Sequence, residues 1–81
     1  MELKIISPFR QKVYNIAWLE LNTPVGNFVI QPGHAPMVLS LAPHKPITFC
    51  LTNGKQESLI IKEGFVEITR TSASIVINED V

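Results

Sequence analysis

The chain of 81 residues is built from short runs in which apolar and polar side chains alternate. In the last of these runs, Ala73, Ile75 and Ile77 alternate with Ser74 and Val76. Such alternation is typical of a strand with one buried face, because successive side chains point to opposite sides. Apolar residues nowhere recur at helical spacing over three turns, and six prolines and four glycines divide the chain into pieces of strand length. The pattern therefore predicts an all-β protein.

Eight strands are predicted, most of them rich in β-branched or aromatic residues. They cover Glu2–Ser7, Lys12–Leu21, Phe28–Gln31, Met37–Leu41, Ile47–Leu51, Glu57–Lys62, Phe65–Arg70 and Ala73–Asn78. A single sheet of this size could not hide so many apolar faces, so two sheets must pack face to face. We therefore expect a flattened two-sheet β-sandwich of about 8–10 short strands that fills residues 1–81 as one domain.

Two segments break the simple pattern. The strand around Ile16-Ala17-Trp18-Leu19 is almost continuously apolar, so either it is buried on both faces or a β-bulge shifts its alternation. The indole of Trp18 needs a hydrogen-bond partner if it lies inside. Asn53-Gly54, between two apolar runs, predicts a type I′ hairpin because both residues tolerate positive φ.

Charge and cysteine content narrow the function classes. Seven basic and seven acidic residues cancel, so the chain lacks the basic excess with which proteins grip nucleic acid. The single cysteine, Cys50, excludes an internal disulfide and suits a reducing compartment. No run approaches the roughly 20 apolar residues of a membrane span, and the apolar run at the N-terminus is too short for a signal peptide. We expect no direct insertion into a membrane.

Candidate chemistry is sparse. His34, His44 and Cys50 are the possible metal ligands, but their spacings of ten and six residues match no compact zinc pattern. Cys50 lies in a predicted strand between apolar neighbours, with no adjacent base to activate it as a nucleophile. The four glycines form no phosphate-binding cluster, and the seven carboxylates are scattered. We therefore expect no catalytic residue, no metal site and no cofactor.

The stretch Thr23–Met37 is the most distinctive part of the chain. It places a short apolar strand between the turn Pro24–Asn27 and the loop Pro32-Gly33-His34-Ala35-Pro36. Prolines and glycines make this loop stiff, and stiff loops on a rigid scaffold are where binding residues tend to lie. Met37 and Val29 are either core residues or part of an apolar contact patch, and we favour the core for both.

This stretch resembles the signature of the epsilon subunit of rotary ATP synthases, which is called delta in mitochondria. The matching positions are Gly26, Ile30, Pro32, Gly33, His34, Ala35 and Pro36. Weaker likeness continues through Leu3–Ser7, the Asn53-Gly54 hairpin, Glu63–Ile68 and Ser74–Asp80, so that it spans nearly the whole chain.

The resemblance implies the N-terminal β-sandwich domain of that subunit, at the foot of the central stalk. It implies one surface on the gamma subunit and a turn on the ring of c subunits, no catalytic residues, and a role in coupling rotation between proton flow and ATP synthesis. The implied location is the cytoplasmic face of the bacterial inner membrane, reached through the complex. Gly26 and Asn27 are implied at the ring-facing turn, and His34 on the gamma side together with Ser7. The full set of expected partner contacts is Ser7, Gly26, Asn27, Pro32, Gly33, His34, Ala35 and Pro36.

The sequence also departs from that family. Asn27 stands where a glutamate is common, Val29 stands where glycine is usual, and the segment around Tyr14-Asn15-Ile16 is shorter. Most members continue with two helices beyond the position of Val81, so we expect no C-terminal helical hairpin here. If the chain is complete, helix-based inhibition and ATP binding are excluded.

Two other function classes remain open. The main alternative is a free-standing β-sandwich adaptor or ligand-binding module, which predicts a concave apolar pocket and no stalk partner. A small metal-dependent enzyme of the same fold class predicts bound zinc or iron.

Overall fold

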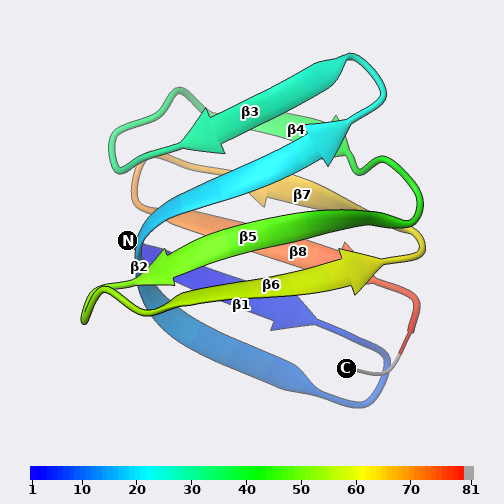
Figure 1. Cartoon of the computed structure of the whole chain (residues 1–81), viewed down its shortest axis with the longest axis horizontal. Coiled ribbons are helices and arrows are strands. Elements are labelled where there is room, and N and C mark those ends of the chain that lie inside the picture. Colours follow the sequence, from blue (N-terminus) through cyan, green and yellow to red (C-terminus); the bar gives the residue numbers. More distant parts are fainter. Residues whose placement is uncertain (80–81) are drawn as a thin grey trace.

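The computed structural model describes residues 1–79, and it confirms the prediction of an all-β fold (Figure 1). Within this range there are eight strands and no helix. They are β1 (Glu2–Ile6), β2 (Gln11–Thr23), β3 (Gly26–Ile30), β4 (Met37–Ser40), β5 (Lys45–Leu51), β6 (Gln56–Ile61), β7 (Gly64–Ile68) and β8 (Ser72–Ile77). Accordingly, the described part of the chain contains no helix that could cross a membrane.

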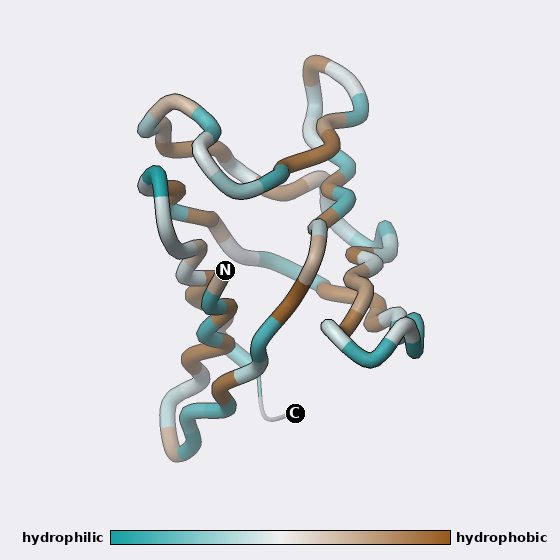
Figure 2. Tube along the Cα trace, turned by 90° about the vertical axis from the view of Figure 1, so that its left-hand side faces the viewer, coloured by the Kyte–Doolittle hydropathy of each residue, from teal (hydrophilic) through white to brown (hydrophobic). Residues whose placement is uncertain are grey.

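The strands form two packed layers, and β2 belongs to both of them. The first sheet has the order β4-β7-β8-β1 and ends on the first half of β2, and its β1–β8 pair is parallel. In the second sheet, the other half of β2 lies between β3 and β5, and β6 forms the far edge. Seen along the strands, the layers form two stacks in which hydrophobic and hydrophilic positions alternate (Figure 2). The molecule is flattened, with extents of 27 × 26 × 19 Å.

A β-bulge lets β2 pass from one sheet to the other. The register with β5 shifts between Ile16 and Trp18, which leaves Ala17 as the extra residue. Ile16 and Leu19 are both fully buried, although a regular strand would turn residues three apart to opposite faces. The bulge therefore explains the missing alternation of the sequence, and Trp18 lies half-buried on the outer face instead of in the core.

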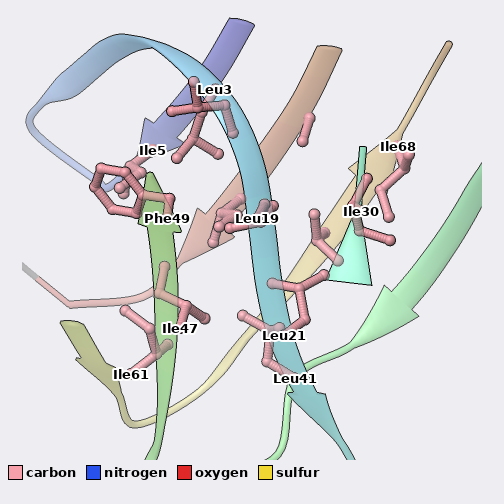
Figure 3. Close-up of a cluster of buried hydrophobic side chains, with 14 of the residues drawn as sticks. Leu3, Ile5, Leu19, Leu21, Ile30, Leu41, Ile47, Phe49, Ile61 and Ile68 are labelled. Atoms are coloured by element: carbon pink, nitrogen blue, oxygen red, sulfur yellow. The ribbon is translucent and has the colours of Figure 1, made fainter. Parts of the chain in front are cut away.

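The core fills the space between the two sheets with mostly aliphatic side chains, and every strand but β4 contributes a buried one (Figure 3). Its fully or almost fully buried members are Leu3, Ile5, Ile16, Leu19, Leu21, Ile30, Leu41, Ile47, Phe49, Ile61, Val66, Ile68, Ala73, Ile75 and Ile77. The ring of Tyr14 packs on Phe49 with centroids 4.9 Å apart. The predicted alternation of β7 and β8 is confirmed, because Val66, Ile68 and Ala73 point inward while Glu67 is exposed.

The hairpin between β5 and β6 differs from the predicted type I′ turn. Gly54 has a φ of 94°, but Asn53 is not among the residues with positive φ. The Gly54 N–H donates to the Leu51 carbonyl at 2.9 Å, and the Leu51 N–H donates to the Lys55 carbonyl at 2.8 Å. This is a type I turn followed by a glycine in the left-handed region, the usual three-residue hairpin. The Asn53 side chain instead accepts a hydrogen bond from the Lys55 N–H at 2.9 Å.

Candidate functional site

The loop of residues 31–36 joins the edge strands β3 and β4 and lies on the surface. Its first part is a turn in which the His34 N–H donates to the Gln31 carbonyl at 3.1 Å. Pro32 supplies the fixed φ of the second position, and Gly33, with a φ of 87°, supplies the positive φ of the third, as a type II turn requires. The Gly33 N–H also donates to the Arg70 carbonyl at 2.7 Å, so the loop is tied to the β7–β8 turn. The loop is therefore both exposed and rigid.

The His34 ring is half-buried and has a fixed tautomer when neutral. Its Nδ1 lies 2.9 Å from the Ala35 carbonyl oxygen. A carbonyl can only accept, so Nδ1 carries the hydrogen and Nε2 presents its lone pair. Among residues 1–79, the ring has no hydrogen-bonded nucleophile or carboxylate.

Gly26 and Asn27 lie at the opposite end of β3, where they leave the β2–β3 turn. The Thr23 hydroxyl closes this turn by donating to the Gly26 carbonyl at 2.8 Å and accepting from the Val25 N–H at 3.3 Å. Gly26 has a φ of 135°, which other residues rarely adopt. The exposed Asn27 amide donates to the Asn22 side chain at 3.2 Å. An uncharged, hydrogen-bonded amide thus occupies the position where the resemblance leads one to expect a carboxylate.

Ser7 does not share a surface with His34. The loop of residues 31–36 enters β4 at Met37, which is level with Ile68, whereas Ser7 follows the far end of β1 (Figure 1). Ser7 is also buried, and its N–H and hydroxyl both donate to the Arg10 carbonyl, at 2.9 and 3.2 Å. The structure thus brings together Pro32, Gly33, His34, Ala35 and Pro36 at one end of the sandwich, and places Ser7, Gly26 and Asn27 at the other.

An apolar patch on the outer face of the first sheet escaped the sequence reasoning. Cross-strand pairing aligns Phe65 of β7, Val76 of β8 and Ile6 of β1 in one row, and Phe65 is 47% exposed. Val38 and Val13 lie in the neighbouring row, 66% and 53% exposed, where they pair with Glu67 and Lys4 on the two edge strands. A signal was present in the sequence, since Ile5-Ile6, Phe65-Val66 and Ile75-Val76 place apolar residues at consecutive positions and hence on both faces.

The expectation that Val29 belongs to the core is wrong. Its side chain is 51% exposed on the outer face of the second sheet, because Phe28 and Ile30 take the inward positions of β3. Met37 is neither a fully buried core residue nor a fully exposed contact residue, since it is partly buried and packs against the core cluster.

The three candidate metal ligands are not brought together. His34 lies in the loop between β3 and β4, His44 in the turn before β5, and Cys50 near the end of β5. Cys50 is buried, and its thiol donates to the Leu51 carbonyl at 3.5 Å. Across residues 1–79, no group of three or more histidine, cysteine, aspartate or glutamate side chains is placed to hold a metal ion.

The family model described as ATP synthase, Delta/Epsilon chain, beta-sandwich domain matches residues 1–80. A search of curated proteins returned no match. A chain in the mitochondrial ATP synthase of Euglena gracilis, in a structure of OSCP, F1 and the c-ring, superposes with a TM-score of 0.88 at 23% identity. A chain in the central stalk and c-ring of the Tetrahymena thermophila mitochondrial ATP synthase gives 0.80 at 16% identity.

Both superpositions cover 98% of this chain, but only 51% of the Euglena chain and 63% of the Tetrahymena chain. The sequence thus spans about half to two thirds of these structural relatives. At such low identity the superpositions establish the fold alone, whereas the family model extends over almost every residue. The chain therefore belongs to the ATP synthase delta/epsilon family and carries its β-sandwich domain.

Proposed function

We propose that this protein is a non-catalytic central-stalk subunit of a proton-translocating ATP synthase. In this role it binds the gamma subunit and the c-ring and helps to couple rotation to ATP synthesis. Its location is the membrane surface that carries the complex, which in a bacterium is the cytoplasmic face of the inner membrane. Family membership supports this assignment, and the superposed chains belong to structures titled as ATP synthase assemblies with a c-ring.

The observation that carries the proposal is the apolar patch on the outer face of the first sheet, which β4 connects to the rigid loop of residues 31–36. Phe65, Val38 and Val13 are all about half exposed or more on this face. Exposed apolar patches of this kind mark protein interaction sites. The loop of residues 31–36 leads into β4 next to Val38, whereas the row of Phe65, Val76 and Ile6 lies toward the other end of the sheet. The conformation of the loop is fixed before any partner arrives, which lowers the entropic cost of binding.

The two ends of β3 suit a protein that contacts two partners. The loop of residues 31–36 at one end is assigned to the gamma subunit, and the turn with Gly26 and Asn27 at the other end to the c-ring. Because the turn and the loop lie at opposite ends of a molecule 27 Å long, two large partners can bind at the same time. Ser7 contributes to partner binding only by shaping the β1–β2 turn, since it is buried and its hydroxyl donates to the Arg10 carbonyl.

Binding to the purified gamma subunit of the same ATP synthase tests the proposal. We expect Phe65→Ser and His34→Glu each to weaken the complex about tenfold or more in a calorimetric titration, by removing apolar contact area or inserting a charge. Ile60→Ser is the matched control, because Ile60 is 68% exposed but lies on β6, the edge strand of the second sheet that is farthest from β3 and the loop of residues 31–36. Absence of any binding by the unmodified chain would favour the free-standing adaptor instead.

A further inference from the structure

A small recess lies on the outer face of the second sheet. Side chains of β2, of β3 and of the residue after β3 line it: Trp18, Glu20, Val29 and Gln31. Glu20 and Val29 are cross-strand partners, and Trp18 lies two residues before Glu20 on the same face. Leu19 pairs with Ile30, so Gln31 lies across from Trp18. The recess is therefore a square of neighbouring side chains on a rigid strand pair, immediately before the loop of residues 31–36.

The charge of Glu20 has no partner within residues 1–79. Four carboxylate residues in this range are half-buried, namely Glu2, Glu20, Glu57 and Glu79. Glu2 pairs with Lys4 at 3.7 Å, Glu57 pairs with Lys55 at 3.6 Å, and Glu79 accepts a hydrogen bond from the Lys62 N–H at 2.7 Å. Glu20 alone of the four forms neither an ion pair nor a side-chain hydrogen bond. Its oxygens remain open to a cation from outside.

The lining of the recess selects the kind of cation. An indole ring beside a carboxylate attracts a cation through both the ring quadrupole and the charge. A guanidinium group suits this pair better than an ammonium group, because it is planar, stacks on aromatic rings and presents a fork of N–H donors to a carboxylate. The Gln31 side-chain oxygen offers a further acceptor, and Val29 offers apolar contact to the methylene stem.

We propose that the recess formed by Trp18, Glu20, Val29 and Gln31 binds an arginine side chain of the protein that covers the loop of residues 31–36. That this protein is the gamma subunit rests on the proposed function. Binding of arginine by the recess does not depend on the proposed function, because all four residues that line the recess belong to this chain.

Nuclear magnetic resonance of the ¹⁵N-labelled chain tests the recess directly. Trp18 is the only tryptophan, so its indole N–H gives a single identifiable signal. Titration with N-acetyl-arginine amide should shift this signal and the Val29 and Gln31 backbone amides in a saturable way. The neutral isostere N-acetyl-citrulline amide should leave them almost unchanged, and Glu20→Gln should abolish the response to arginine. Equal shifts with both probes, or none with arginine, would overturn the proposal.

The second arm uses the gamma subunit and separates the inference from the proposed function. Glu20→Gln should weaken binding about fivefold, as expected for a partly exposed ion pair with an aromatic neighbour. Glu57→Gln removes the same charge from β6, the edge strand farthest from β3, and should leave affinity unchanged. If the unmodified chain fails to bind gamma, the proposed function is wrong. The nuclear magnetic resonance titration with N-acetyl-arginine amide still shows whether the recess binds arginine. If Glu20→Gln binds gamma as well as the unmodified chain, the arginine does not come from gamma and that assignment is wrong.

Discussion

His44 holds a left-handed backbone conformation, with a φ of 58°, in the turn between β4 and β5. It is the one non-glycine residue with positive φ among those that the structure describes. Its N–H donates to the Ile61 carbonyl at 2.8 Å, and this bond fixes the turn against the end of β6. A residue with a Cβ pays roughly 1–2 kcal/mol of conformational free energy in the left-handed region. The backbone of His44 is therefore strained, and the imidazole itself plays no part in the strain.

Substitution at this residue should reveal the strain. We expect His44→Val to lower the free energy of unfolding by about 1–2 kcal/mol, because a β-branched residue opposes positive φ most strongly. His44→Gly should raise it by about 0.5 kcal/mol, since glycine removes the Cβ clash but gains freedom in the unfolded chain. Urea denaturation of the two variants beside the unmodified protein measures both effects, and equal stabilities would contradict the explanation.

Gly64 is required for a different reason, namely space. A Cβ at this position would lie 2.7 Å from the Val76 carbonyl oxygen, which belongs to the neighbouring strand and cannot rotate away. We expect Gly64→Ala to destabilise the fold by about 1–3 kcal/mol. At Gly54, by contrast, nothing lies within 4 Å of such a Cβ, although φ is 94°. Thermal unfolding of both alanine variants should therefore show the larger loss for Gly64→Ala.

At the scale of elements, alternation was enough to predict every strand but not its partners. The inward-facing positions of a strand, such as Ile75 and Ile77 in β8, can be predicted from the alternation of the strand's own residues. The parallel pairing of β8 with β1, by contrast, joins the two ends of the chain, and no local pattern specifies it. The predicted strand Ile47–Leu51 also begins two residues later than β5, which starts at Lys45, and the Asn22 side-chain amide donates to the Pro46 carbonyl at 2.9 Å.

The bulge in β2 provides a test at this scale. Deleting Ala17 would restore strict alternation along β2, yet it would remove the bend by which one strand serves two sheets. We expect the deletion to lower the free energy of unfolding by more than about 2 kcal/mol, as for other losses of core packing. The exposed substitution Ala17→Ser should change it by less than about 0.5 kcal/mol. Circular dichroism with urea compares them, and a deletion variant of unchanged stability would show that the bulge is dispensable.

At the scale of the whole molecule, the candidate site could be predicted only in part. The stiffness of the loop of residues 31–36 follows from its prolines and glycines, and the structure agrees through the fixed turn at Gly33. Which residues share one end of the sandwich depends on strand direction in three dimensions, so the separation of Ser7 from His34 could not be inferred. The same limit applies to Val29. Its apolar side chain suggested a place in the core, but Phe28 and Ile30 occupy the inward positions of β3, so Val29 lies on the outer face.

The central claim is that two opposite ends of one rigid sandwich contact two different partners. Hydrogen–deuterium exchange of the chain alone and within a reconstituted rotor of gamma subunit and c-ring tests it most directly. We expect slower exchange in the complex at two places: at Ala35 in the loop of residues 31–36, and at Val25 to Asn27 in the β2–β3 turn. We also expect little change at the turn of residues 52–55, which carries none of the predicted contacts. A complex in which either the loop of residues 31–36 or the β2–β3 turn exchanges as fast as in the free chain would contradict this claim.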